Sequence, residues 1–373
     1  MRLAKLVEEG ARQLAICNAC RYCEGYCAVF PAMERRLEFA AGDLNYLANL
    51  CHNCGECYYA CQYAPPHEFA VNIPRVMAQI RVETYAHYAW PAPLGRVFRD
   101  NGLVSALLLC AVLIASLLLA TLLLGGERLF SAVPGGNFYA LIPHNVMAAS
   151  FGVVSLFVLL ALLMGFLNFW RDVGESPGEL LKPVALWQGL ADALSMKNLH
   201  GAGEDCTFKG EEQRSPWRRW FHHLTFYGFM LCFAATSVGT IYHYVFGWVA
   251  PYALTSLPVL LGTLGGVGLV IGPAGLYWLG RRRDEATADP AQRGMNTAFI
   301  VLLLLTSVTG LALLAWRETA ALGLLLVVHL GVVMALFVTL PYGKFVHGIY
   351  RAAALVKFAL ESRRPGHQVG GDG

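Results

Sequence analysis

The sequence predicts a mainly α-helical protein with a small N-terminal domain followed by a six-helix transmembrane bundle. Three observations support this prediction. Eight of the eleven cysteines lie between residues 17 and 61. Only 14% of the 373 residues are charged, whereas a soluble domain has about a quarter of its residues charged. The region around the cysteines also lacks the alternation of polar and apolar residues that is typical of β-strands.

The cysteines form two runs with the same spacing, offset by 34 residues: Cys17, Cys20, Cys23 and Cys27, then Cys51, Cys54, Cys57 and Cys61. In bacterial two-cluster ferredoxins this spacing binds two [4Fe-4S] clusters, and the fourth cysteine of each run ligates the other cluster. We therefore expect a helical, ferredoxin-like two-cluster domain. Its two ligand sets are Cys17, Cys20, Cys23 and Cys61, and Cys51, Cys54, Cys57 and Cys27. In one departure from the usual pattern, no proline directly follows the fourth cysteine of either run.

Zinc and disulfide bonds are the alternative uses of these cysteines. A structural zinc ion is closed by four ligands, often from two C-x2-C pairs, and needs no further cysteines at the observed spacing. Disulfide bonds need an oxidising compartment, and the charged start of the chain lacks the apolar segment of a signal peptide. The spacing therefore favours two iron–sulfur clusters.

We assign residues 1–88 to the cluster domain. It is expected to contain a short amphipathic helix over residues 1–16, a second helical face between the two cysteine runs, and a helix that begins near Pro74. Residues 89–102 combine tryptophan and arginine side chains, which is typical of a membrane interface. We interpret them as an interfacial linker.

A membrane-spanning helix needs about 20 mainly apolar residues. Six stretches qualify: 103–125, 144–169, 219–247, 256–280, 295–316 and 321–342. They predict a membrane domain over residues 103–350 that contains a long loop at 170–218, with a tail at 351–373. Within the loop, residues 184–199 predict an amphipathic helix that lies along the membrane or the cluster domain, and a polar, turn-rich segment follows it.

The basic residues predict how the spans are oriented. The loops 126–143, 248–255 and 317–320 contain only two arginines, whereas residues 281–293 and 344–364 contain nine Lys and Arg. Cytoplasmic loops carry the excess of basic residues. We therefore expect both termini, the cysteine runs and the 170–218 loop to lie in the cytoplasm.

Histidines in or beside the spans are candidate haem ligands, because ionisable side chains in a membrane are usually functional and histidine ligates haem iron. His329 and His347 are 18 residues apart, which places them on one face of a helix about 27 Å apart. His222 and His243 are 21 residues apart and also lie near one face. Since these two spans run in opposite directions, we predict two sites: His222 with His347 near the cytoplasm, and His243 with His329 on the other side.

Several alternatives apply to these histidines. His144 lies at the same level as His243 and His329, on the side away from the cytoplasm, and can replace one of them as a ligand. Pro341 is expected to kink the sixth span and disturb the alignment of its two histidines. A histidine at the end of a span can also simply sit among lipid headgroups. His223, together with Arg218 and Arg219, can donate hydrogen bonds to a haem propionate or a quinone.

The chain resembles the tricarballylate (citrate) utilisation protein B family over nearly its whole length. The resemblance rests on CHNCGECYYACQYAPPHEFAVNIPR at residues 51–75 and RRWFHHLTFYGFMLCFAAT at 218–236. It implies a protein of the bacterial inner membrane with iron–sulfur clusters and a cytochrome b part. Such proteins reoxidise the flavin of a partner FAD-dependent tricarballylate dehydrogenase and pass the electrons to quinone. Residues 329–351 are also similar to the di-haem gamma subunit of nitrate reductase and to membrane subunits of heterodisulfide reductase, which implies His329, His347 and His222 as haem ligands.

We therefore expect an electron-transfer protein with two [4Fe-4S] clusters, one or two b-type haems and quinone as acceptor. The sequence has no catalytic triad or nucleotide-binding glycine motif, so the substrate chemistry is expected in the partner. Three alternatives remain: the same conduit with another donor, a tricarboxylate carrier, and a structural anchor for the dehydrogenase. A carrier of trianions needs basic residues near the bilayer midplane, where the predicted spans have none. The net charge of +3 gives no indication of a nucleic-acid partner.

Overall fold

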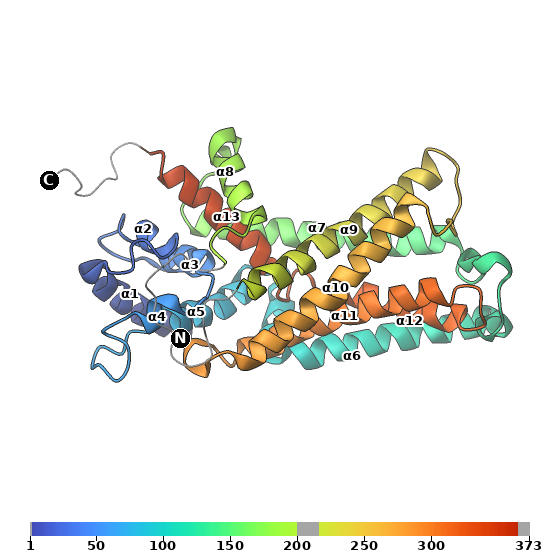
Figure 1. The fold of residues 1–373 in the computed structure, drawn as a ribbon, viewed down its shortest axis with the longest axis horizontal. Coiled ribbons are helices and arrows are strands. Elements are labelled where there is room, and N and C mark those ends of the chain that lie inside the picture. The colour runs from blue at the N-terminus through green and yellow to red at the C-terminus, as the bar shows by residue number, and fades with distance from the viewer. Residues whose placement is uncertain (1, 200–215, 365–373) are drawn as a thin grey trace.

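The computed structural model describes residues 2–199 and 216–364. Thirteen α-helices account for most of these residues, and none of the described residues lies in a β-strand. The molecule is elongated (Figure 1). The cysteine-containing domain forms one end, and six long helices run from it to the other end. This arrangement confirms the predicted fold class.

The N-terminal domain consists of five helices: α1 (Arg2–Cys20), α2 (Val29–Met33), α3 (Ala41–Leu50), α4 (Glu56–Tyr59) and α5 (Ile73–Tyr88). The predicted helix near Pro74 is confirmed as α5. Pro74 is tolerated in the first turn of α5, where a backbone N–H has no partner within the helix. The Asn72 side chain accepts a hydrogen bond from the Arg75 backbone N–H (3.1 Å) and so caps the helix start.

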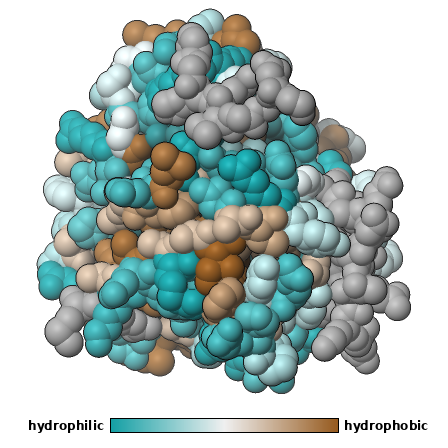
Figure 2. Space-filling view, turned by 90° about the vertical axis from the view of Figure 1, so that its left-hand side faces the viewer, coloured by the Kyte–Doolittle hydropathy of each residue, from teal (hydrophilic) through white to brown (hydrophobic). Residues whose placement is uncertain are grey.

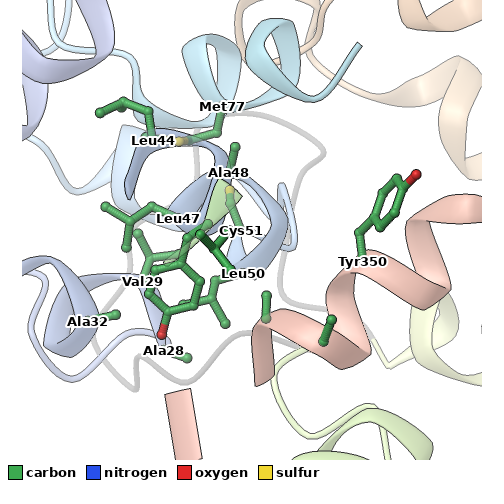
Figure 3. Packing of buried hydrophobic residues seen from close by; sticks show 14 of the residues in the cluster. Ala28, Val29, Ala32, Leu44, Leu47, Ala48, Leu50, Cys51, Met77 and Tyr350 are labelled. Carbon is green, nitrogen blue, oxygen red and sulfur yellow. The ribbon is translucent and has the colours of Figure 1, made fainter. Parts of the chain in front are cut away.

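The core of this domain also contains the last helix of the chain, α13 (Val346–Glu361). Leu47 on α3 and Met77 on α5 are completely buried. Tyr350 on α13 belongs to the same hydrophobic cluster (Figure 3). Residues 351–361, which the sequence analysis placed in a tail, are therefore part of a helix that packs against the cluster domain.

Six helices are long and apolar enough to cross a membrane: α6 (Ala92–Gly125), α7 (His144–Asp172), α9 (Trp217–Tyr244), α10 (Leu257–Arg282), α11 (Gln292–Ala315) and α12 (Leu322–Thr339). They correspond to the six predicted stretches. The interfacial linker predicted at 89–102 is mostly helical, because α6 already begins at Ala92 and is kinked at Asn101 (φ −139°, ψ 42°). The interfacial segment is thus the first part of the first span.

The sixth span is shorter than predicted. Helix α12 ends at Thr339, and a turn separates it from α13. Pro341 lies in this turn and lacks the N–H that would continue the helix. His329 and His347 therefore lie on two different helices, and the expectation that they share one face of a single helix is wrong.

Helix α8 (Pro183–Leu194) is the helix predicted within the 170–218 loop. It packs directly on α13, since a Cβ atom on Gly189 would lie 2.6 Å from the backbone of Val356. Residues 200–215, most of the predicted polar segment, lie outside the described residues. Short 3₁₀ turns complete the connections: Gly126–Phe130, Pro134–Gly136, Phe138–Ala140, Pro177–Leu181 and Glu285–Thr287.

Helices α9 and α10 cross at glycines, which allow their backbones to approach closely. A Cβ atom on Gly265 would lie 2.7 Å from the carbonyl oxygen of Gly228, and one on Gly272 would lie 2.7 Å from that of Phe221. Small residues at helix crossings are typical of membrane bundles. This crossing fixes the position of His222, which follows Phe221 on α9.

The two ends of the molecule differ in character. Figure 2 looks onto the end formed by the cysteine-containing domain, which is mainly hydrophilic with a narrow apolar band. The opposite end contains the connections between α6 and α7, α9 and α10, and α11 and α12 (Figure 1). Helices α1 and α13 lie at the same end, as an even number of spans requires.

Candidate metal centres

The two cysteine runs are positioned by different local structures. In the first run, Cys20 is the last residue of α1, and Arg21 follows with a φ of 54°. In the second run, Cys51 directly follows α3 as its C-cap, and the chain then turns through Asn53 (φ 54°) and Gly55 (φ 92°). These left-handed residues turn the chain sharply, which lets successive thiols of a run face a common centre.

The first predicted ligand set surrounds one cavity. The volume of this cavity is about 300 Å³, and Cys17, Cys20, Cys23 and Cys61 contribute to its lining. Burial and the charges of the other three cysteines raise the pKa of Cys17 to about 12. Cys61 comes from the second run, so the structure has the crossed arrangement that the ferredoxin spacing predicts.

The second predicted ligand set surrounds a smaller cavity of about 20 Å³, which is lined by Cys27, Cys51, Cys54 and Cys57. Burial raises the pKa of Cys54 to about 11 and the pKa values of Cys27 and Cys57 well above their usual range. Cys57 also lines the first cavity, and the charge of Cys23 acts on its thiol. The two sets therefore lie side by side.

This donor arrangement suits iron–sulfur clusters better than zinc. Within residues 2–199 and 216–364, no three His, Cys, Asp or Glu side chains are close enough to share one metal ion. A zinc site needs all of its thiolates about 2.3 Å from one ion. In a [4Fe-4S] cluster each thiolate binds a different iron, so the thiols stand further apart. Because buried thiols hold their protons, cluster binding must release them.

His222 on α9 and His347 on α13 face each other, as predicted for the pair near the cytoplasm, which we call the inner haem site. Their ring centres are 5.8 Å apart, with an angle of 65° between the rings. Two imidazoles on one metal, each with a bond of about 2 Å, have ring centres roughly 6 Å apart. The Nδ1–H of His347 donates to the carbonyl oxygen of Lys344 (2.5 Å), which leaves Nε2 as the free ligand atom. Nδ1 of His222 is buried and has no hydrogen-bond partner within residues 2–199 and 216–364.

The structure does not bring His243 and His329 into ring contact with each other. The His243 ring instead stacks on that of His144, with ring centres 3.8 Å apart and 24° between the planes. His329 faces α11, where its Nδ1 is 2.9 Å from Oγ1 of Thr309. The Thr309 hydroxyl donates to the Leu305 carbonyl oxygen (2.6 Å), so its oxygen accepts from His329 Nδ1–H. His329 thus also presents Nε2, but without the predicted partner.

Sequence reasoning missed two arginines that contact the second cysteine run. Arg81 on α5 and Arg351 on α13 both donate to the Cys51 carbonyl oxygen, at 2.9 and 2.8 Å. Arg218 on α9, considered only as a donor to a propionate or quinone, donates to the carbonyl oxygen of His52 (2.7 Å). The sequence feature that could have identified Arg218 and Arg351 is their spacing, because each lies four residues from a candidate haem ligand.

Comparisons with known proteins agree over both parts of the chain. A family described as Citrate utilization protein B matches residues 100–368. The Citrate utilization protein B Fer4-like domain matches residues 10–87. Citrate utilization protein B of Escherichia coli is 53% identical over 366 residues, which cover 97% of this chain and 94% of that protein. No solved structure matches the chain significantly.

Proposed function

We propose that this chain, which belongs to the citrate utilization protein B family, is a membrane electron-transfer protein. In this proposal it reoxidises the flavin of a partner FAD-dependent tricarballylate dehydrogenase and delivers the electrons to the quinone pool. Two [4Fe-4S] clusters and b-type haem, when bound, supply carriers that each hold one electron, whereas a reduced flavin releases two. The residues of this chain position those groups one after another along the molecule and exclude water from around them.

The observation that carries the proposal is the order of the candidate sites along the molecule. Tyr22, which lines the first cavity, is 64% exposed, so this cavity reaches the surface. The second cavity shares Cys57 with the first. Arg351 then joins the second cysteine run to the helix that carries His347. This sequence of sites supports transfer from a partner at the surface to an acceptor in the membrane.

We place the protein in the bacterial inner membrane with both termini and the cysteine-containing domain in the cytoplasm. Six candidate spans support a multi-pass membrane protein. The basic residues at 281–293 and 344–364 support the orientation, because they concentrate at the end of the bundle where the cysteines lie. A soluble dehydrogenase in the cytoplasm can then dock beside the first cavity.

We assign His222 and His347 as the ligands of an inner haem b. The spacing of their rings and the free Nε2 of His347 support this assignment. His243 and His329 remain candidate ligands of a second haem. Because they do not meet in the structure, one haem per chain is the first expectation.

The test reconstitutes the purified protein in liposomes with the dehydrogenase, tricarballylate and a soluble quinone analogue. Quinone reduction should require both proteins, and Cys54→Ser should abolish it by removing one ligand of the second set. Cys232→Ser removes an isolated cysteine of α9 and serves as the matched control with wild-type turnover. An unchanged rate in Cys54→Ser contradicts the relay. Uptake of tricarballylate into liposomes without a redox partner contradicts electron transfer in favour of a carrier.

A further inference from the structure

Two helices present the same pair of residues to the second cysteine run. On α9, Arg218 precedes His222 by four residues, and on α13, Arg351 follows His347 by four. Residues four apart lie on the same face of a helix, one turn from each other. Each candidate haem ligand therefore has an arginine beside it, on the side toward the cysteines.

Both arginines bind the same loop, residues 51–53. Arg351 Nη2 donates to the Cys51 carbonyl oxygen at 2.8 Å. Arg218 donates to the carbonyl oxygens of His52 (2.7 Å) and Asn53 (3.2 Å). Arg81, buried on α5, adds a second hydrogen bond to Cys51 at 2.9 Å. Three guanidinium groups thus converge on a loop that begins with a candidate cluster ligand.

These arginines bring positive charge to the second ligand set. The charge of Arg218 acts on the Cys54 thiol, and that of Cys51 on the Arg351 guanidinium. The buried carboxylate of Glu56 opposes this positive charge, and at the Cys54 thiol its charge acts more strongly than that of Arg218. The three guanidinium groups that donate to the carbonyl oxygens of residues 51–53 outnumber this carboxylate.

The first ligand set has a different electrostatic environment. After burial, the leading influences on the Cys17 thiol are the charges of other cysteines in its set. Of the arginines that the structure describes, Arg21 alone donates its side chain to a carbonyl oxygen of the first run, that of Asn18 (3.2 Å), and this contact is exposed. An exposed charge is screened by water and salt, whereas the buried arginines of the second set are screened much less. The two sets thus differ in fixed positive charge.

We propose that Arg218 and Arg351 give the cluster held by Cys51, Cys54, Cys57 and Cys27 a higher reduction potential than the cluster held by the first set, and that this difference directs electrons toward His222 and His347. The inference rests on the proposed function. Each electron added to a cluster makes it more negative, and nearby positive charge stabilises the reduced form. The two electrons of the reduced flavin of the partner move inward one at a time, and its protons leave to solvent. At each step the group nearer the surface is oxidised and the next one inward is reduced.

The test is a redox titration, followed by electron paramagnetic resonance, of the anaerobically purified holoprotein. Cys54→Ser identifies which signal belongs to the second set. In the wild type, this signal should have the higher midpoint potential. Arg351→Gln should lower that midpoint by about 59 mV or more, which is tenfold in a one-electron equilibrium, and should leave the other signal unchanged. Arg351→Lys retains the charge and should restore most of the difference.

Arg363→Gln is the matched control. It removes an equal charge from an exposed residue just beyond the C-terminal end of α13. Among the described residues, the Arg363 side chain binds only the carbonyl oxygen of Ala359. The inference is overturned if the two signals of the wild type have equal midpoint potentials, or if the second-set signal has the lower one. It is also overturned if Arg351→Gln and Arg363→Gln have the same effect on the midpoint potential of the second-set signal. Absence of iron and labile sulfide from the wild type overturns the proposed function itself.

Discussion

The cysteine-containing domain and the membrane bundle are stabilised in different ways. In the first, large apolar side chains such as Leu44 and Leu47 are completely buried. In the second, many apolar side chains point outward, and Leu123 on α6 is 77% exposed. The close contacts between α9 and α10 instead involve glycines such as Gly265 and Gly272.

This difference follows from the surroundings of each part. Burial of apolar surface away from water stabilises a soluble domain. It does not drive helices together in lipid, where close packing and hydrogen bonds do so. The junction between the two parts uses a third device, a buried ion network. Lys357 on α13 contacts Glu175 at 2.7 Å and Glu361 at 3.2 Å, and Glu361 binds Arg36 of the cysteine-containing domain.

The largest effect is expected at Cys57, the thiol that lines both cavities. Cys57→Ser should remove more than half of the iron and labile sulfide and abolish quinone reduction, because it takes a ligand from the second set and disturbs the first. Cys20→Ser, which affects only the first cavity, should remove half. Iron and sulfide analysis of the purified variants measures both. Equal losses in the two variants contradict the shared position of Cys57.

The next largest effect is expected at the junction. Lys357→Met leaves two buried carboxylates with one partner fewer, and breaking a buried ion pair costs about 3–5 kcal/mol. The cysteine-containing domain should then lose iron at lower urea concentrations, with the bundle less affected. Arg12→Met breaks an exposed pair with Glu9 and should cost less than about 1 kcal/mol. If both variants release iron at the same urea concentration, the network does not hold the two parts together.

In the membrane bundle, an added methyl group should be harmful where helices cross. Gly272→Ala places a Cβ atom 2.5 Å from the Thr225 hydroxyl oxygen, and overpacking of this kind costs about 1–3 kcal/mol. It should also move α9 and lower the haem content by displacing His222. Gly280→Ala meets nothing within 4 Å and should behave as wild type. Haem content and thermal unfolding in detergent measure both.

The smallest effect is expected on the lipid-facing surface. Leu123→Ala should change the free energy of unfolding by no more than about 0.5 kcal/mol, as for other exposed positions. The same truncation at buried Leu47 should cost about 2–5 kcal/mol. Thermal unfolding and the urea concentration at which iron is released compare the two variants. A large loss at Leu123 indicates that this face packs against another protein.

The grouping of the cysteines around two cavities could be predicted from the sequence because the spacing within each run is local and repeats. The six spans could be predicted because their composition is distinctive. The role of α13 in the core of the cysteine-containing domain could not, because Tyr350 and Leu47 are brought together only by the folding of the whole bundle.

The histidine pairs show which contacts residue spacing along a helix can predict and which it cannot. Counting residues placed His222 opposite His347 correctly, although the calculation assumed one continuous sixth helix. It failed for His243, which meets His144 in the structure. A turn after Thr339 separates α12 from α13, and which helices become neighbours depends on packing that spacing within one helix does not encode.

Whether this chain carries electrons through iron–sulfur clusters and haem is tested most directly by the cofactor content of the anaerobically purified protein. We would measure iron, labile sulfide and pyridine haemochrome per chain, with a dithionite-reduced minus oxidised spectrum. We expect iron and sulfide for two [4Fe-4S] clusters, together with b-type haem bands that His347→Ala removes while the cluster iron is retained. Stoichiometric zinc in place of iron and sulfide, or haem bands unchanged in His347→Ala, would contradict this expectation.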